Sequence, residues 1–397
     1  MAKKVADMDI EDILAKLDKE FQPPEQLPRV KSNLLSLDIV LGGQGIPLGK
    51  TIEISSDSGV GKSTMLLHVA RNLCMQGYRV VWIDTESATD PEFLDKMRLT
   101  EFIETGMFRI YQEATFAAVE KILDTLIPTG QIPFIVIDSL ANMTSESKVV
   151  STVFDKANAK SIDTNQVAGD ARYQTSFMKK YKFMANKYQT TIFFVNQFRQ
   201  FIPTSYGQVA KTVSSGAKAV RYNMDCCIEL LPAGKIKGKR KTINGEEEIN
   251  IGSNVNFFIR EKSRICDGGI KVPGAIYFGQ GFSNIATIAI LMEKKQVEYN
   301  GKYVKMLNKV GSSYTLTFGG EQMKVMYQSG LREAITKNYD TIMSEFDASD
   351  FNVVQDDLNS AADIDINEDS VNFDENEVVY NSDGTVVDSG DNTDYEE

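Results

Sequence analysis

Short apolar runs separated by helical stretches are the main feature of the chain from about residue 32 onward. Each run is almost continuously apolar, which is typical of strands that are covered on both faces in a parallel sheet flanked by helices. The clearest candidate strands are Thr51–Ser55, Val80–Asp84, Phe134–Asp138, Thr191–Val195, Cys226–Leu231 and Asn254–Arg260. The pattern therefore predicts an α/β fold with a mostly parallel sheet.

The hydrophobic pattern also suggests a division into domains. Residues 1–31 contain a short amphipathic helix, with apolar residues from Ile10 to Phe21 on one face, followed by a proline-rich linker. We expect this segment to dock on its own body or, as a subunit-docking arm, on a neighbouring copy. Residues 32–283 are predicted to form the α/β core, and residues 284–346 a small C-terminal α/β domain.

An acidic tail follows at residues 347–397. It contains twelve Asp and five Glu, no Lys or Arg, and few periodic apolar positions, so we predict that it is disordered. The whole chain has a net charge of −12, which is less negative than the tail alone. The remainder of the chain is therefore mildly basic. Two functions of the tail remain open, namely a solubilising segment or an internal competitor for a basic nucleic-acid site.

Composition argues against several classes of protein. His68 is the single histidine, which disfavours Ser-His-Asp triads and multi-histidine metal sites. The four cysteines form no CxxC pair, and a reducing compartment is expected. No apolar run approaches the roughly 18 residues of a membrane span, and the first residues lack signal-peptide character. We therefore expect a cytoplasmic protein with no membrane partner.

A candidate phosphate-binding loop follows the first strand. The sequence SDSGVGKS, starting at Ser56, matches G-x-x-x-x-G-K-[ST] except that Ser56 replaces the first glycine. Gly59 and Gly61 would let backbone N–H groups face a phosphate, Lys62 would reach the β- and γ-phosphates, and Ser63 would hold Mg²⁺. A Gly/Ser turn that binds nothing is the alternative. The candidate nucleotide-binding residues here are Ser56, Asp57, Ser58, Gly59, Val60, Gly61, Lys62, Ser63 and Thr64.

Polar side chains at the ends of three further strands support a nucleotide site. Asp138 ends one strand, where its carboxylate would lie beside a metal ion near Ser63. Glu86 follows a second strand and would orient a water for attack on the γ-phosphate. Gln197 follows a third and would sense the γ-phosphate. Each residue alone could be a cap or turn residue, but the combination predicts a site for ATP and Mg²⁺.

Together these segments resemble the motifs of the RecA/UvsX/RadA group of ATP-dependent DNA strand-exchange proteins. The resemblance covers roughly residues 32–282 and lies in NLLSLDIVLGGQGIPLGK, DTESATDP, FIVIDS, FVNQFR and REKSR, in the family order and at similar spacing. It implies a RecA-like P-loop ATPase core.

The resemblance assigns roles at the phosphate end of the nucleotide. Lys62 and Ser63 resemble the phosphate and Mg²⁺ contacts, and Asp138 resembles the acid that supports the metal through water. Glu86 is similar to the catalytic glutamate. Gln197 is similar to the glutamine that couples the γ-phosphate to the second DNA-binding loop.

Two further pairs of residues take their roles from the resemblance. Asp90 and Phe93 resemble the residues that contact the adenine. Lys262 and Arg264 resemble the cations that reach across a subunit interface to the ATP of the neighbour. There they would stabilise charge on the transferring phosphoryl group, as an arginine finger does.

DNA contacts are expected in two loops. The first spans residues 147–169 and leads into a helix, and the second spans residues 198–216. Basic side chains would neutralise phosphates there, and main-chain N–H groups would bind them without reading sequence. Tyr206 either stacks on bases or packs under its own loop. The candidate DNA-binding residues are Arg172, Lys179, Arg199, Tyr206, Gly207, Lys211, Ser214, Ser215 and Gly216.

The resemblance implies an ATP-dependent recombinase that polymerises on single-stranded DNA and catalyses homologous pairing and strand exchange, with DNA-stimulated ATP hydrolysis between subunits. Its partners would be single-stranded DNA, double-stranded DNA during pairing, further copies in a helical filament, a single-strand-binding protein and a loading mediator. We expect it in the cytoplasm of a bacterium or a phage-infected bacterium. The alternatives are a RecA-fold hexameric DNA helicase and a non-catalytic nucleotide-binding protein that coats single-stranded DNA or acts as a mediator. Intact Lys62, Glu86 and Asp138 argue against the non-catalytic alternative.

Overall fold

The computed structural model describes residues 10–11, 14–16, 28–144, 164–201, 211–214, 218–242, 245–260, 263–351, 379–380 and 386–387. Most of both candidate DNA-binding loops, Lys262 and most of the acidic tail lie outside this described part. The same holds for most of the predicted N-terminal helix.

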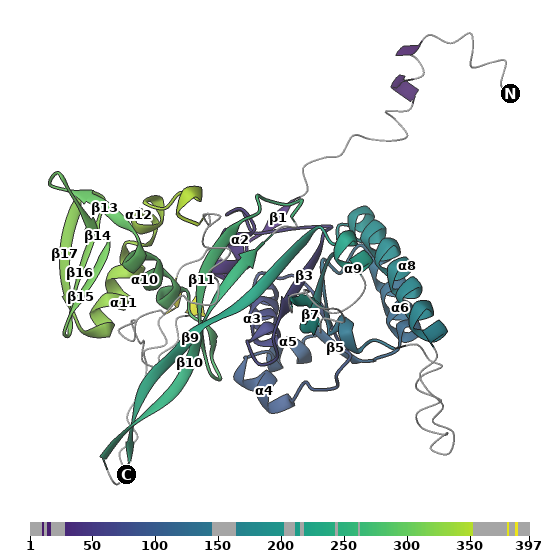
Figure 1. Cartoon of the computed structure of the whole chain (residues 1–397), viewed down its shortest axis with the longest axis horizontal. Helices are drawn as coiled ribbons and strands as arrows, with labels where there is room; N and C mark the ends of the chain where they lie inside the picture. The colour runs from purple at the N-terminus through teal and green to yellow at the C-terminus, as the bar shows by residue number, and fades with distance from the viewer. Residues whose placement is uncertain are drawn as a thin grey trace, which may run out of the picture.

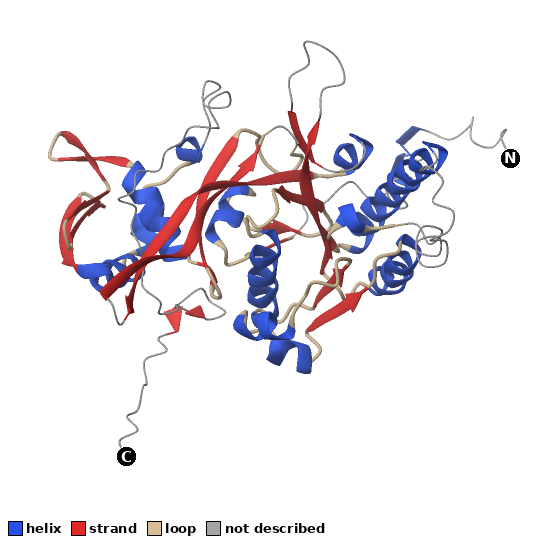
Figure 2. Ribbon diagram, turned by 60° about the horizontal axis from the view of Figure 1, so that its bottom comes forward, coloured by secondary structure: helices blue, strands red, loops and turns tan. Residues whose placement is uncertain are grey.

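A ten-stranded sheet forms the centre of the molecule (Figures 1 and 2). Its parallel part runs in the order β5-β4-β6-β7-β3-β9, and β10, β11 and β12 continue it in antiparallel fashion. All six candidate strands belong to this sheet, so the predicted α/β class is confirmed. The bounds are β3 Thr51–Ser56, β4 Val80–Asp84, β5 Phe108–Gln112, β6 Phe134–Asp138, β7 Thr191–Phe201, β9 Cys226–Thr242, β10 Gly245–Ile259, β11 Ile270–Tyr277 and β12 Gly281–Phe282.

Helices cover both faces of the sheet, which explains why its strands are apolar at successive positions. Side chains of a strand alternate between the two faces. Trp82 therefore joins the larger hydrophobic cluster, with α3 (Lys62–Met75). Ile83 joins the second cluster, with α6 (Phe116–Leu126) and α8 (Thr164–Tyr188), on the opposite face.

Short helices connect these layers, and polar caps fix where several of them begin. Asp90 accepts a hydrogen bond from the Glu92 N–H (3.1 Å) at the start of α4, which has Pro91 in its first turn. Thr115 caps α6 in the same way. The remaining helices of the core are α2 Leu35–Val40, α4 Pro91–Lys96, α5 Thr100–Glu104 and α9 Lys218–Asn223.

The region after Phe282 packs against the sheet through α10 (Asn284–Lys294), which is capped by Ser283. Residues 285–292 of α10 are buried between β11 and a small antiparallel sheet, within the larger hydrophobic cluster. This burial explains the longest apolar stretch in the sequence. The other elements here are β13 Gln296–Tyr299, β14 Lys302–Lys305, β15 Leu307–Val310, β16 Ser313–Phe318, β17 Glu321–Met326, α11 Tyr327–Lys337 and α12 Tyr339–Ser344. None of the helices in the described part is long and apolar enough to cross a membrane.

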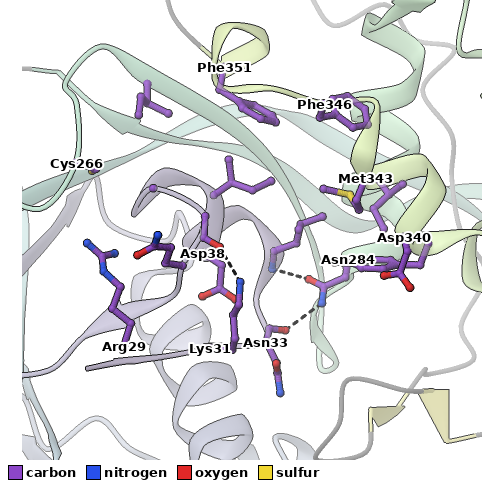
Figure 3. Close-up of a pocket in the computed structure, with 18 of the residues that line it drawn as sticks. Arg29, Lys31, Asn33, Asp38, Cys266, Asn284, Asp340, Met343, Phe346 and Phe351 are labelled. Carbon is purple, nitrogen blue, oxygen red and sulfur yellow. Dashed lines mark hydrogen bonds between the residues drawn. The ribbon is translucent and has the colours of Figure 1, made fainter. Parts of the chain in front are cut away.

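Both ends of the described body lie close to a groove of about 1360 Å³ between α2 and helices α10 to α12. Figure 3 shows Asn284 reaching the chain beside α2, where it donates to the carbonyl of Asn33 and accepts from the Leu35 N–H. Arg29 and the buried Phe351 line the same groove. The fully described phosphate loop, residues 56–64, is not part of its lining.

Candidate nucleotide-binding site

The phosphate loop connects the end of β3 to the start of α3, as predicted. Gly59 (φ 77°) and Gly61 (φ 112°) adopt left-handed conformations that L-residues with a side chain rarely take. A Cβ at Gly61 would lie 2.6 Å from Cδ1 of Ile276 on β11. The backbone angle at Gly61 therefore favours glycine, and a Cβ there would also displace the end of the Ile276 side chain.

Lys62 is the buried cation of the loop, and its residue is 7% exposed. Its Nζ donates to the carbonyls of Ser56 (3.2 Å) and Asp57 (2.9 Å) and to Ser56 Oγ (2.9 Å). Burial lowers the pKa of Lys62, and the charges of Asp138, Glu86 and Asp57 oppose that shift. The serine that replaces the first glycine thus contributes an extra acceptor for this ammonium group.

Ser63 and Asp138 form the candidate metal site. Ser63 Oγ donates to Asp138 Oδ2 at 2.6 Å, although the two residues are 75 positions apart. Burial raises the pKa of Asp138 to about 6, and the hydrogen bond from Ser63 opposes the shift. A hydroxyl and a carboxylate beside a phosphate loop fit Mg²⁺, which is bound by one or two protein oxygens together with substrate phosphates.

Glu86 and Gln197 meet beside this pair. Gln197 Nε2 donates to Glu86 Oε1 at 3.3 Å, and Ser139 Oγ donates to the same oxygen at 2.8 Å. The turn that carries Glu86 is shaped by the buried Asp84, whose carboxylate accepts from the backbone N–H groups of Glu86, Ala88 and Thr89. The structure therefore brings together four residues that we predicted from separate strand ends, namely Ser63, Glu86, Asp138 and Gln197.

Asp90 and Phe93 lie at the start of α4. The side chain of Asp90 caps this helix, and half-buried Phe93 packs against the larger core cluster. These contacts give both residues structural roles, and their contact with adenine stays a prediction.

Phe278 is an aromatic residue near the loop that the sequence patterns did not single out. It follows Tyr277 at the end of β11 and is 57% exposed. Two positions before Phe278, Ile276 on β11 approaches Gly61 of the phosphate loop. An exposed aromatic directly after an apolar strand, in YFGQG, was the available sequence signal.

Arg264 lies at the opposite end of β3 from the phosphate loop. Its N–H donates to the Asp225 carbonyl (2.7 Å), and the Asp225 N–H donates to the carbonyl of Thr51, the first residue of β3 (2.8 Å). The loop starts after the last residue of β3, Ser56. Thr51 and Ser56 are five residue steps apart along the strand, which separates them by about 17 Å. The structure therefore does not bring Arg264 to the phosphate loop of its own chain, and Lys262 lies outside the described residues.

The second candidate DNA-binding loop starts as a ribbon of two strands. β7 continues to Phe201 and pairs with β8 (Lys211–Ser214), so that Phe198 lies opposite Ser214. Our expectation of a loop from residue 198 is therefore wrong at both ends, because backbone pairing extends the strand beyond its apolar part. Gln197 lies at the base of this ribbon.

The structure describes the candidate DNA-binding residues only in part. Lys179 is exposed on α8. Arg172, Arg199, Lys211 and Ser214 have a described backbone in α8, β7 and β8, but not a described side chain. The remaining candidates lie outside the described residues, namely Tyr206, Gly207, Ser215 and Gly216.

The fold and this site define a P-loop nucleotide-binding protein with a mostly parallel sheet. Residues 11–262 match the family model of the RecA N-terminal domain. The chain therefore belongs to the RecA family of recombinases, and the resemblance noted from the sequence is confirmed.

Individual relatives are distant. Protein RecA of Fusobacterium nucleatum is 29% identical over 271 residues, which cover 68% of this chain and 65% of that protein. Protein RecA of Paracoccus denitrificans is 24% identical over 308 residues, which cover 74% and 79%. A crystal structure of the RadB recombinase aligns at 18% identity with a TM-score of 0.43, covering 64% of this chain and 97% of that one.

Proposed function

We propose that this chain is an ATP-dependent DNA recombinase that polymerises on single-stranded DNA and catalyses homologous pairing and strand exchange. ATP would be bound and hydrolysed between adjacent subunits. The observation that carries the proposal is the separation of Arg264 from the phosphate loop by the whole length of β3. Each subunit would hold nucleotide at one end of β3 and offer cations to its neighbour at the other end.

A repeated head-to-tail contact of this kind generates an open helical filament unless the rotation closes a ring. Buried charges support a mechanical link between the second DNA-binding loop and the segment before Lys262. Glu229, whose side chain is 6% exposed, pairs with Arg221 of α9 (3.0 Å) and with Arg260 of the segment that leads to Lys262 (3.2 Å). It thereby joins the helix after the second DNA-binding loop to the segment that would reach the neighbour. Residues 1–31 would add a second contact as a docking arm.

At the phosphate end, Lys62 would bind the β- and γ-phosphates. Ser63 and Asp138 would hold Mg²⁺, which when bound neutralises charge on the phosphates. Glu86 would orient a water and take its proton as the water oxygen attacks the γ-phosphorus, while the bond from that phosphorus to the β,γ-bridging oxygen breaks and ADP leaves. Gln197 would report the γ-phosphate to the ribbon that continues from β7.

At the base end, we assign adenine to the region of Asp90, Phe93 and Phe278. The exposed ring of Phe278 offers a flat apolar surface near the phosphate loop, and stacking on an aromatic side chain suits an adenine base.

DNA would bind in the two loops that precede α8 and α9. Contacts to phosphates would hold single-stranded DNA without reading its sequence, and base pairing with a duplex would supply the recognition. Lys179 on α8 is the exposed described candidate for such a contact. A single-strand-binding protein and a loading mediator would be the further partners in a bacterial or phage-infected cytoplasm.

Electron microscopy on single-stranded DNA with a slowly hydrolysed ATP analogue tests the assembly. Open helical filaments are expected. Closed rings would instead support a hexameric helicase, and unassembled particles would contradict an intersubunit ATP site.

A mixing experiment tests the shared site directly. Arg264→Ala and Lys62→Ala should each lose DNA-stimulated phosphate release, while Arg264→Ala still binds ATP. In a 1:1 mixture, about a quarter of the interfaces pair an intact loop with an intact Arg264, so activity should partly return. No recovery in mixed filaments would contradict the proposal that the two residues act across an interface.

A further inference from the structure

Ser139 directs its hydroxyl at the proposed catalytic carboxylate from a buried position. The residue is 0% exposed, and its Oγ donates to Glu86 Oε1 at 2.8 Å. Ser139 also stands at the N-cap of a short 3-10 helix, Leu140–Asn142. Serine at such a position usually caps the helix with its side chain, but this hydroxyl makes no cap hydrogen bond. Its hydrogen bond goes to Glu86 instead.

The backbone of Ser139 is fixed from the neighbouring strand by Thr85. The Ser139 N–H donates to Thr85 Oγ1 (2.7 Å), and Thr85 Oγ1 donates to the Ser139 carbonyl (2.8 Å). The Thr85 N–H donates to the carbonyl of Asp138 (2.8 Å). These three bonds join the ends of β4 and β6, so the backbone that carries the Ser139 hydroxyl is held in place independently of Glu86.

Glu86, in contrast, lies on an exposed turn. A carboxylate on a surface turn samples several rotamers, and each misplaced rotamer removes a general base from its position. Ser139 and Gln197 both donate to Oε1, so Oε2 is the oxygen that the proposed reaction assigns to the water. One oxygen is thus an anchor and the other is available for chemistry.

We propose that Ser139 is a positioning residue for Glu86, which holds Oε1 so that Oε2 orients the attacking water. This inference rests on the proposed ATPase function. Gln197 donates a second hydrogen bond to Oε1, from the strand that continues into the DNA-binding ribbon. The backbone of Ser139 is fixed, because it belongs to the buried junction of β4 and β6.

The test compares steady-state ATP hydrolysis on saturating single-stranded DNA for the full chain and for Ser139→Ala. The variant should lose roughly tenfold in kcat, with KM for ATP changed by less than about twofold, since Ser139 acts through the base. In a Glu86→Gln background, Ser139→Ala should change the residual rate by less than about twofold, because the carboxylate it positions is gone.

Ser36→Ala is the matched control. Like Ser139, Ser36 is 0% exposed and its hydroxyl donates a hydrogen bond, here to the carbonyl of Pro273 at 2.7 Å. Ser36 lies on α2, and this hydrogen bond does not involve Glu86. The Ser36→Ala variant should hydrolyse ATP like the unmodified chain. An equal loss in both alanine variants would attribute the effect to general destabilisation and overturn the inference.

The remaining outcomes separate the two proposals. If the chain hydrolyses ATP on DNA but Ser139→Ala is unchanged, or if its loss multiplies with that of Glu86→Gln, the positioning role is wrong and the proposed function stands. If the unmodified chain releases no phosphate with DNA, the proposed function fails, and this inference fails with it.

Discussion

Asp225 is the residue whose removal should destabilise the fold most clearly. It precedes β9, is 5% exposed, and uses its carboxylate to join two layers of the core. Oδ2 accepts from both the N–H and the Oγ1 of Thr51, each at 3.1 Å, and Oδ1 pairs with Lys182 of α8. Asp225→Ala removes all three contacts from the start of the strand that leads to the phosphate loop.

The expected loss follows from these contacts. Thr51 is fully buried, so its N–H is left without an acceptor, which costs about 1–3 kcal/mol. The side chain of Lys182 is 25% exposed and keeps a hydrogen bond to the Asn223 carbonyl. Losing the ion pair with Asp225 therefore contributes less to the loss of stability than it would for a fully buried lysine. We expect a total of about 3 kcal/mol, at the low end of the range for broken buried ion pairs. Asp225→Asn keeps an acceptor for Thr51 and should lose about 1–2 kcal/mol.

Urea denaturation of the full chain measures this, with the slope m unchanged and the midpoint lowered. The control is Glu333→Gln, which breaks the exposed pair of Glu333 with Lys337 and should leave the midpoint unchanged. A loss below about 0.5 kcal/mol for Asp225→Ala would refute the argument that this carboxylate is an essential acceptor.

Four further results are expected. Glu86→Gln should bind ATP normally but stall turnover in a phosphate-release assay, and weakened binding would contradict its role as a base. Phe278→Ala should weaken ATP about tenfold by fluorescence titration while inorganic triphosphate binds unchanged, whereas equal losses would place the ring away from the base. Magnesium-dependent nucleotide affinity should fall as pH is lowered through about 6, because Asp138 then takes up a proton, and Asp138→Asn should lack that dependence. Hydrogen bonds from Cys226 and Ser263 lower the pKa of the half-buried Cys266 to about 7. The rate of alkylation at Cys266, measured by peptide mapping, should therefore rise from pH 6 to pH 8, and a rate that does not change with pH would contradict this.

Local features of the sequence were sufficient for the strands and for the phosphate loop. Continuous apolar runs such as Phe134–Asp138 predict doubly covered strands, because a strand with helices on both faces needs apolar side chains at every position. Gly61 and Lys62 are recognisable because the loop's backbone angles and its charge depend on residues that are adjacent in the chain. Likewise, the rule that ligands bind at the carboxyl ends of parallel strands places Glu86, Asp138 and Gln197 at one edge.

The lateral order of the strands decided which of these side chains touch, and that order depends on packing over the whole sheet. Because β4, β6 and β7 are neighbours, Glu86 meets Ser139 and Gln197, which are 53 and 111 positions away. The sequence pattern did not identify Ser139 as a site residue, because a serine that follows a strand is usually a helix cap. The antiparallel strand β11, which Phe278 directly follows, brings Ile276 against Gly61 through a contact that no local pattern records.

The direction of the chain through β3 had the largest consequence for function. The phosphate loop and Arg264 are about 200 positions apart in the sequence. This spacing alone would allow Arg264 to reach the phosphate loop of its own chain. In the fold, hydrogen bonds through Asp225 fix Arg264 at the start of β3, whereas the loop leaves its end. A strand is stiff and extended, so its length keeps the two motifs apart. The sequence by itself determined the chemistry of each group, and the tertiary structure decided that one chain does not bring these two groups together.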